Sequence, residues 1–478
     1  MRGVWTAQQI RDTEQVLLDR TPEGALMRRA AFGLAAHARR MLGRVAGSRV
    51  VLLVGAGNNG GDALWAGVEL RRRGVGVTAV LLVPDRAHPA GLAALRRAGG
   101  RIVGADGGEV ALAGADLALD GIVGISGHGG LRPVAAELVA AVEVAGVPIL
   151  AVDLPSGVDP DTGAVDGPAV TATETTTFGA AKPVHVLAAP RCGPVHVVDI
   201  GLGPLLPPPH AHVLEASDVS ARWPMPGPTD DKYSQGVVGI AAGSAVYPGA
   251  AVLAAGAAVL ATSGMVRFAG SAAPEVRDHW TEVVAVDVIA DAGRTQAWTV
   301  GPGIGTDDAG RAVLAAALGR DVPLCVDADA ITLLARHADL RQAVRGRVVV
   351  LTPHAGEFAR IAGDVGPDRV AAVRRAAAEL GVTVLLKGNA TVVADPDGRA
   401  LVHPATSSWA ATAGSGDVLS GIIGALLAAG LEPWWAAGCG AFLHARAADI
   451  AAGGAPAPAS ALQAAIPDAI RSLRSACR

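Results

Sequence analysis

Aromatic side chains are scarce in this chain, and together they make up only 3% of its 478 residues. Proteins that bind single-stranded nucleic acids stack bases on such rings, and proteins that bind the phosphate backbone carry a strong positive charge. The formal net charge here is −4. Because both features are missing, we expect no nucleic-acid partner.

Cysteine is also rare, and Cys192, Cys325, Cys439 and Cys477 show no paired spacing. This pattern excludes both a disulfide framework and a zinc-finger type of site, and it is typical of a reducing compartment. The first residues lack the apolar core of a secretion signal and resemble the start of an amphipathic helix. We therefore predict a cytoplasmic protein.

Long uncharged apolar runs are missing although 51% of the residues are hydrophobic. The best candidate, residues 418–430, is too short to span a bilayer and is rich in alanine and glycine. We expect no membrane association. The length instead predicts a globular protein of two or three domains.

Lysine accounts for only three of the 40 basic residues, at Lys182, Lys232 and Lys387. Arginine therefore carries most of the positive surface charge. A lysine in this chain is more readily explained as a residue selected for its compact ammonium group. The alternative is that three rare residues are placed by chance.

The amino-terminal half shows strand and loop patterns of an α/β domain. Residues 1–45 have helical periodicity, and a buried strand at 49–54 leads through GAGNNGGD (55–62) into a helix that extends to Arg73. The GxGxxG match is weak alone, and an Asn-Gly turn is the alternative. Further strands at 115–120 and 148–153 end in Asp120 and Asp153. Since parallel strands meet ligands at their carboxyl ends, these side chains predict one site.

These motifs resemble the NAD(P)HX epimerase family, which has a Rossmann-like domain and interconverts the R and S epimers of hydrated NAD(P)H. The resemblance rests on GNNGGD (57–62), Asp120 before a glycine loop, and VDLPSG (152–157), and it covers about residues 1–205. It implies that Asp153 performs acid/base chemistry and that K⁺ binds Asn59, Asp120 and Ser156. It implies substrate contacts from Asn58, Asn59, Gly60, Gly61, Asp62, Gly124, Ile125, Ser126, Gly127, His128, Gly129, Gly130 and Asp153. Ala63 and the long 124–132 loop depart from the family pattern.

Proline is dense between residues 203 and 228, which disfavours sustained helix or sheet. We place the domain junction at 206–229 and the second domain at 230–478. In that half, buried strands at 237–242, 298–300, 324–326, 348–351 and 383–386 each end in a polar, glycine-bearing loop. Alternation with helices predicts a mostly parallel sheet with its ligand along one edge.

The string TAGSGD at 412–417 precedes an apolar run that predicts a helix. A glycine-rich turn before a helix start suits a phosphate, and Asp417 could take a proton from an attacking hydroxyl. The alternative is a simple turn with Asp417 as the N-cap. His354 alone favours a role as a helix-capping or a core histidine, and Asp327 and Asp329 fit either metal ligands or polar turn residues.

Six ordered motifs in this half resemble the NAD(P)H-hydrate dehydratases of the ribokinase-like superfamily, and their order after an epimerase-like half matches the fused bifunctional repair enzymes. Ala355, where these usually have proline, departs from the pattern. The resemblance implies that Mg²⁺ and ADP act as cofactor and co-substrate, that Asp417 is the base, and that the S epimer is dehydrated to NAD(P)H with release of AMP and phosphate. It implies substrate contacts from Ala250, Gly303, His354 and Asp417, and nucleotide contacts from Lys387, Gly388, Asn389, Ala390, Thr391 and Gly416.

We thus predict an α/β protein with a Rossmann-like and a ribokinase-like domain, acting on NADHX, NADPHX and ADP as a homo-oligomer. Two alternatives remain open at this stage. One is a vitamin or sugar kinase of the same superfamily with a non-catalytic amino-terminal binding domain. The other is loss of catalysis in the first domain only, against which Asn59, Asp120, Asp153 and Ser156 all argue.

Overall fold

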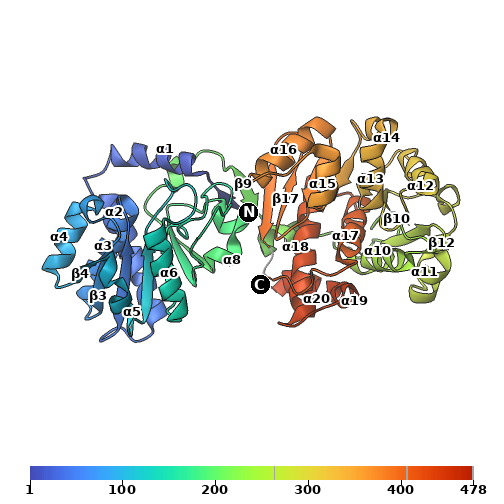
Figure 1. The fold of residues 1–478 in the computed structure, drawn as a ribbon. Helices are drawn as coiled ribbons and strands as arrows, with labels where there is room; N and C mark the ends of the chain where they lie inside the picture. Colours follow the sequence, from blue (N-terminus) through green and yellow to red (C-terminus); the bar gives the residue numbers. More distant parts are fainter. Residues whose placement is uncertain (263, 405–406, 476–478) are drawn as a thin grey trace. The chain divides into compact units, whose positions relative to one another are not determined.

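The computed structural model describes residues 1–262, 264–404 and 407–475, so Cys477 lies outside the described residues. By its internal contacts the chain divides into two compact units. One consists of Gly3–Ala211, and the other of Met1–Arg2 together with His212–Arg478 (Figure 1). Among the described residues, no helix is both long and apolar enough to cross a membrane. Each unit is described separately below.

The first unit contains a parallel sheet of seven strands in the order β4-β3-β2-β5-β6-β7-β8. Its strands are β2 (Arg49–Val54), β3 (Gly76–Leu81), β4 (Arg101–Gly104), β5 (Leu117–Gly121), β6 (Ile149–Val152), β7 (Glu174–Phe178) and β8 (Val195–Val198). The order reverses beside β2, which is the place where such sheets bind ligands. The predicted Rossmann-like α/β class is confirmed.

Successive side chains of β2 explain the three layers of this unit. Leu52 packs in a core with Leu34, Leu64 and Leu95, whereas Leu53 packs on the opposite face with Leu138. A strand covered on both faces reads as continuously apolar, as β2 does. The helices are α1 (Ala7–Leu18), α2 (Ala25–Leu42), α3 (Asn58–Arg71), α4 (Pro89–Arg97), α5 (Gly108–Leu112), α6 (Pro133–Val144), α7 (Val184–Leu187) and α8 (Ala189–Cys192).

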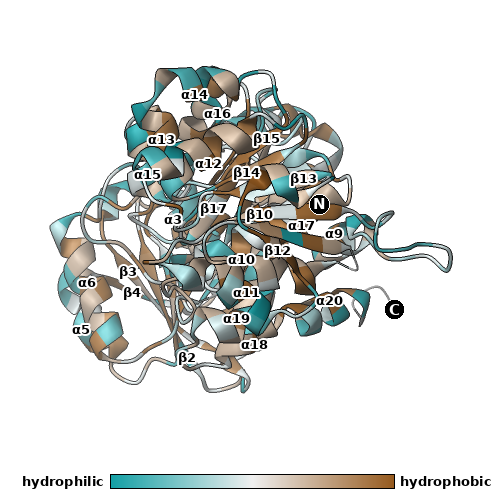
Figure 2. Ribbon diagram, turned by 90° about the vertical axis from the view of Figure 1, so that its right-hand side faces the viewer, coloured by the Kyte–Doolittle hydropathy of each residue, from teal (hydrophilic) through white to brown (hydrophobic). Residues whose placement is uncertain are grey.

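The second unit has a larger sheet that runs β9-β18-β17-β16-β15-β14-β13-β10-β11-β12. Strands β10 to β16 pair in parallel, and β17 and β18 add an antiparallel hairpin. Figure 2 shows strands β14 and β15 as strongly hydrophobic, as expected for strands covered on both faces. The predicted ribokinase-like α/β class is confirmed in this unit.

The strands of the chain outside the first unit's sheet are β1 (Arg2–Val4), β9 (Ala211–Val213), β10 (Val237–Ala241), β11 (Met265–Ala269), β12 (Val284–Val286), β13 (Ala297–Val300), β14 (Leu324–Val326), β15 (Val349–Leu351), β16 (Thr383–Leu386), β17 (Ala390–Ala394) and β18 (Ala400–Pro404). The helices after the junction are α9 (Ala216–Arg222), α10 (Pro248–Ala261), α11 (Ala273–His279), α12 (Asp308–Leu318), α13 (Asp329–Arg336), α14 (Ala338–Ala343), α15 (Ala355–Ala362), α16 (Arg369–Leu380), α17 (Ser415–Ala428), α18 (Pro433–Ala452), α19 (Ala459–Ala464) and α20 (Ile466–Ser475).

Helix α17 lies in the core of this unit, with every residue from Val418 to Ala428 buried. It packs closely on α10, because Gly421 has no side chain where a Cβ would collide with the Ala254 carbonyl. This close packing fixes the position of α17 against α10. The start of α17, where a ligand could bind, is therefore held in place.

The structure differs from the sequence-based expectation in two local features. The proline-dense stretch at 206–229 contains strand β9 and helix α9. The glycine turn after β2 is only three residues long, since α3 begins at Asn58 and includes the predicted loop residues up to Asp62. The Asn58 and Asn59 amides therefore belong to a helix start.

Candidate active sites

A cavity of about 1360 Å³ lies at the carboxyl ends of β2, β5 and β6 in the first unit. Among the residues that line it are most of the predicted substrate contacts, namely Asn58, Asn59, Asp62, Gly124, Ile125, Ser126, Gly127, His128, Gly129, Gly130 and Asp153. Gly60 and Gly61 serve packing instead. An added Cβ at Gly60 would lie 2.5 Å from the Gly55 carbonyl oxygen, and one at Gly61 would lie 2.9 Å from the His88 ring.

The amino-terminal end of α3 opens into this cavity. Gly57 adopts φ +85°, a left-handed conformation that suits glycine, and Asn58 is the first helical residue. The first N–H groups of a helix lack intrahelical partners and carry a partial positive charge. This end of the cavity suits an anionic group of a ligand, such as a phosphate.

A buried oxygen cluster lies beneath the cavity. Ser156 Oγ donates to Asp120 Oδ1 at 2.7 Å, Ser156 N donates to Asp120 Oδ2 at 2.8 Å, and the Val123 N–H donates to Ser156 Oγ at 2.9 Å. Burial raises the pKa of Asp120 to about 6 despite these hydrogen bonds. Asn59 Nδ2 is buried with no hydrogen-bond partner. The closely spaced carboxylate and hydroxyl oxygens of Asp120 and Ser156 are the ligand type that a hard monovalent cation prefers. The unpaired Asn59 Nδ2 is a hydrogen-bond donor, so Asn59 could contribute only its Oδ1 to such an ion.

Asp153 ends β6 in a left-handed conformation at φ +72°, which is unusual for a non-glycine residue. Its carboxylate accepts hydrogen bonds from Lys182 Nζ at 2.7 Å and Thr177 Oγ1 at 2.9 Å. Burial acts to raise the pKa of Asp153, but the Lys182 ammonium and these hydrogen bonds together lower it. Asp153 is thus an ionised carboxylate at the cavity wall.

His185 holds the backbone of Asp153 in this conformation. Its Nδ1 accepts from the Lys182 N–H at 3.0 Å, so Nε2 carries the proton and donates to the Asp153 carbonyl at 2.9 Å. Burial, with the Lys182 charge, lowers the pKa of His185 to about 4, which keeps the ring neutral. Because the strain at Asp153 is retained by specific contacts, it indicates a functional conformation.

Two further carboxyl groups face the same cavity with pKa shifts in the opposite direction. Burial, followed by the charge of Asp153, raises the pKa of Glu14 on α1 and raises that of Asp62 well above its usual range. Groups whose pKa values are pushed apart in one site are suited to divide acid and base roles. Asp62 was predicted from the sequence, whereas Glu14 was not.

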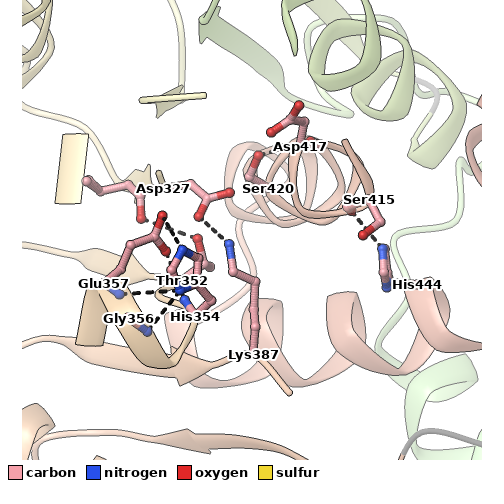
Figure 3. A network of polar contacts seen from close by, with 11 residues as sticks. Asp327, Thr352, His354, Gly356, Glu357, Lys387, Ser415, Asp417, Ser420 and His444 are labelled. Carbon is pink, nitrogen blue, oxygen red and sulfur yellow. Dashed lines mark hydrogen bonds and ion pairs between the residues drawn. The ribbon is translucent and has the colours of Figure 1, made fainter. Parts of the chain in front are cut away.

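In the second unit, the stretch 412–417 forms the start of α17 (Figure 3). The N-cap is Gly414 in the left-handed conformation at φ +88°, and no side chain caps this helix. Asp417 is the third helical residue, so the alternative of Asp417 as N-cap is wrong. Of the first N–H groups of α17, those of Ser415 and Asp417 donate to the carbonyls of Thr412 and Gly414 at 3.2 and 3.1 Å, so an anion at this helix start would meet chiefly the Gly416 N–H.

The Asp417 carboxyl group is well suited to accept a proton near neutrality. Burial, and next the charge of Asp327, raises its pKa to about 7, while the Lys387 ammonium acts in the opposite sense. A base with a pKa close to the working pH transfers protons most effectively.

Lys387, which directly follows β16, pairs with Asp327, which directly follows β14, with Nζ 2.7 Å from Oδ1. A Cβ added at Gly416 would lie 3.2 Å from Lys387 Nζ and 3.8 Å from Asp327 Oδ2. Gly416 therefore keeps the space in front of this ion pair open. Figure 3 shows Lys387 extending between Asp327 and the start of α17.

The other predicted dehydratase residues lie on loops and at the starts of helices and strands. His354 caps α15, since its Nδ1 accepts from the Gly356 N–H at 3.0 Å, and its side chain is 56% exposed. A Cβ added at Gly303 would lie 3.1 Å from Cβ of Ala250 and of Tyr247, so these two loops meet. Within 387–391, Lys387, Gly388 and Asn389 form the turn between β16 and β17, and Ala390 and Thr391 begin β17.

Two buried contacts near this site were not predicted from the sequence. His444 Nε2 bonds the Ser415 carbonyl at 2.8 Å, and burial lowers its pKa to about 4, so the neutral ring donates. Arg369 donates to the Lys387 carbonyl at 3.3 Å and reaches the Gly388 position. Neither residue belongs to a local sequence motif, and each is distant in sequence from the residue it contacts.

Comparison with known proteins assigns both halves to families. Residues 238–468 match the NAD(P)H-hydrate dehydratase family, and residues 23–184 match the family described as YjeF-related protein N-terminus. The bifunctional NAD(P)H-hydrate repair enzyme of Mycobacterium tuberculosis is 59% identical over 438 residues, covering 90% of each chain. That of Mycobacterium leprae is 56% identical over 457 residues, covering 95% of this chain and 94% of the relative.

A solved structure resembles the second unit. It is the ADP/ATP-dependent NAD(P)H-hydrate dehydratase from Bacillus subtilis co-crystallised with ATP/Mg²⁺, with a TM-score of 0.50 and 26% sequence identity, over 55% of this chain and 99% of that one. This chain has two α/β units, and each has a glycine-rich helix start that suits a phosphate group. It therefore belongs to the class of fused α/β enzymes. The chain belongs to the family of bifunctional NAD(P)H-hydrate repair enzymes.

Proposed function

We propose that the first unit epimerises NADHX and NADPHX and that the second unit dehydrates the S epimer at the expense of ADP. The kinship to bifunctional repair enzymes over nine-tenths of the chain supports this function. The observation that carries it is the presence of one polar site per unit, each with a carboxyl group of shifted pKa. The kinase alternative with a non-catalytic first domain is disfavoured by the same kinship.

For epimerisation, the bond between the ring nitrogen and the hydroxyl-bearing carbon breaks as Asp153 takes the hydroxyl proton, which leaves a carbonyl group on the carbon and the electron pair on the nitrogen. The nitrogen then attacks the other face of the carbonyl, and Asp153 returns the proton to its oxygen. Lys182 and Thr177 keep Asp153 ionised beforehand. Asp62, whose carboxyl pKa burial in the same cavity raises, is suited to donate a proton to the ring nitrogen. The start of α3 binds the substrate's phosphates.

Asn59, Asp120 and Ser156 would hold K⁺ in this unit, and the buried oxygen cluster described above fits such an ion. When bound, K⁺ supplies the positive charge that Asp120 lacks among neighbouring side chains. Asn59 and Ser156 then fix the loops that carry Gly124 and Asp153.

For dehydration, Asp417 deprotonates the substrate hydroxyl, whose oxygen attacks the β-phosphorus of ADP, and AMP departs. The phosphorylated hydroxyl then leaves as phosphate, and loss of a proton from the adjacent carbon restores NAD(P)H. The N–H groups of Gly414 and Gly416 stabilise charge on the transferred phosphoryl group, and that of Ser415 joins them by exchanging its bond to the Thr412 carbonyl. Gly303 and His354 position the hydrate.

Lys387, with the turn up to Thr391, binds the nucleotide, and Mg²⁺ would lie among its phosphates. The acidic side chains at this edge fit a cation, since Asp327, Asp329 and Glu357 all raise the pKa of Asp417. Mg²⁺ keeps several waters and needs few protein ligands when phosphates are present. When bound, it neutralises phosphate charge.

The division of the two activities between 1–205 and 230–478, the cytoplasmic location and the homo-oligomeric state stay predictions. Light scattering on the purified chain tests the last of these.

A direct test is incubation of the full chain with an R/S mixture of NADHX, with ADP and ATP in parallel. Loss of both epimers with AMP release and NADH formation is the expected result with ADP. Phosphorylation of a hydroxylated vitamin from ATP without NADH formation would instead support the kinase alternative.

A further inference from the structure

Three side chains with metal-ligand chemistry lie together in the first unit, outside the cavity. They are His37 on α2, Glu174 at the start of β7 and His196 on β8, and their donor atoms are all within 4.8 Å of one another. His37 Nε2 lies 2.7 Å from Glu174 Oε2, and His196 Nε2 lies 3.0 Å from the same oxygen. Among the described residues, this is the sole cluster that meets such a criterion.

Sheet register explains why the three residues meet. His196 on β8 is paired with Thr176 on β7, and Glu174 lies two residues before Thr176, so Glu174 and Thr176 share a face of the sheet. Helix α2 packs across this face and contributes His37. The cluster is at the amino-terminal end of β7, whereas the cavity lies at the carboxyl ends of the strands.

The separations are close to those of a metal site. Ligand atoms at about 2.1 Å from a tetrahedral Zn²⁺ are roughly 3.4 Å apart. The two observed separations, 2.7 and 3.0 Å, are shorter, so an ion requires the side chains to move apart by about 0.4 to 0.7 Å. The two imidazole rings are edge-on, with centroids 3.9 Å apart and an interplanar angle of 70°.

The surroundings favour a ligand over a simple hydrogen-bonded triad. His37 Nδ1 contacts Thr176 Oγ1 at 2.6 Å, which fixes the ring as outer partners of metal-bound histidines do. His37 is buried, while Glu174 and His196 are 29% and 43% exposed, so water can reach a fourth position. Arg40 is the neighbouring positive charge that opposes a cation, and Glu174 offsets it.

We propose that His37 Nε2, Glu174 Oε2 and His196 Nε2 form a binding site for a borderline divalent ion of the zinc class. With water as fourth ligand, the ion cross-links α2 to β7 and β8. Since β7 also carries Thr177, which bonds Asp153, the ion stabilises the strand behind the epimerase site. Two imidazoles and one carboxylate are a donor set that such ions prefer.

The test uses the full chain, free of affinity tags and stripped with a chelator. Equilibrium dialysis against Zn²⁺ with elemental analysis is expected to give one ion per chain, with a raised Tm. Co²⁺ is expected to give the visible absorption of a tetrahedral site. Glu174→Gln keeps a hydrogen-bond acceptor for both rings but loses the charge, so Zn²⁺ affinity is expected to fall at least tenfold.

Matched variants separate this site from non-specific binding. Thr176→Val keeps all three ligands but removes the hydroxyl group that contacts His37 Nδ1. Loss of this contact is expected to weaken Zn²⁺ binding about 10- to 100-fold. His279→Asn, at an exposed histidine of the second unit, should leave it unchanged. Absence of stoichiometric Zn²⁺ binding, or equal affinity in wild type, Glu174→Gln and His196→Asn, would overturn the proposal and leave a hydrogen-bonded triad.

Discussion

Two carboxyl groups with opposite pKa shifts define the chemistry of this chain at the residue scale. Lys182 keeps Asp153 ionised, whereas burial and Asp327 bring the pKa of Asp417 to about 7. The first is a base across the neutral range, and the second becomes a base as pH rises through 7. The two proposed reactions should therefore respond differently to pH.

Replacing Lys182 tests the origin of the first shift. Lys182→Met removes the ammonium that lowers the pKa of Asp153, so burial then dominates and the pKa rises. The acid limb of the epimerisation rate is expected to move to higher pH. The measurement is kcat/KM for R-to-S conversion between pH 4 and pH 9.

Thr177→Val is the matched control, because it removes one neutral hydrogen bond to the same carboxylate. A shift in the same direction but smaller is expected. An acid limb that does not move in Lys182→Met would show that Asp153 is not the titrating base.

Asp417→Asn is expected to stabilise the protein as it removes dehydratase activity. A carboxyl group with a raised folded pKa favours folding when protonated, and this contribution is lost as pH rises from its unfolded pKa to about 7. The amide avoids this loss. By calorimetry, the Tm difference from wild type should be near zero at pH 3, already measurable at pH 5, and largest, at a few degrees, at pH 8.

Asp153 and Asp417 could be predicted from the sequence because each lies in a local glycine-bearing motif. Lys182 could not be assigned to Asp153, since the two are 29 positions apart and only the fold brings them within 2.7 Å. Its rarity as a lysine was the single signal. Glu14 gave no signal, because it occupies an ordinary position on an amphipathic helix.

At the scale of elements, the start of α17 is the feature on which phosphoryl transfer depends. Its first N–H groups face Lys387 and Asp327 across the space at Gly416. Alanine is favoured over glycine inside a helix by about 1 kcal/mol. The absence of a side chain there therefore serves ligand access at a cost in helix stability.

Gly416→Ala is expected to separate stability from binding. The helix gains stability, but the methyl group occupies the space 3.2 Å from Lys387 Nζ. We expect an unchanged or higher Tm and about a tenfold higher KM for ADP, equivalent to losing one charge-assisted hydrogen bond of ~1.5 kcal/mol. Gly319→Ala, at the end of α12, is the control and should leave this KM unchanged. An unaltered KM in Gly416→Ala would place the nucleotide elsewhere.

Element boundaries show where sequence patterns suffice and where they do not. Apolar runs such as 49–54 predicted β2 correctly, because that strand is buried on both faces. Strand β7 was missed since its sequence ETTTF is mostly polar, and its threonines are buried through hydrogen bonds to neighbours that are distant in sequence. The sequence pattern predicts that α3 begins after Asp62, whereas it begins at Asn58. The glycine and asparagine residues before Asp62 are typical of a turn, so no local pattern indicates the helix start.

At the scale of the whole molecule, each proposed site is contained within a single unit. No residue assigned to one reaction belongs to the other, so substitutions should act on one reaction alone. General acid/base groups typically contribute 10²- to 10⁴-fold. Losses of this size are expected in one activity with the other retained.

The most direct measurement of the central claim follows pure R-NADHX by chromatography with ADP and Mg²⁺, using Asp153→Asn, Asp417→Asn and an equimolar mixture of the two. We expect Asp417→Asn to produce the S epimer without NADH, and Asp153→Asn to form NADH no faster than enzyme-free epimerisation allows. The mixture should restore NADH formation. NADH formation from Asp417→Asn alone, or no recovery in the mixture, would contradict the account.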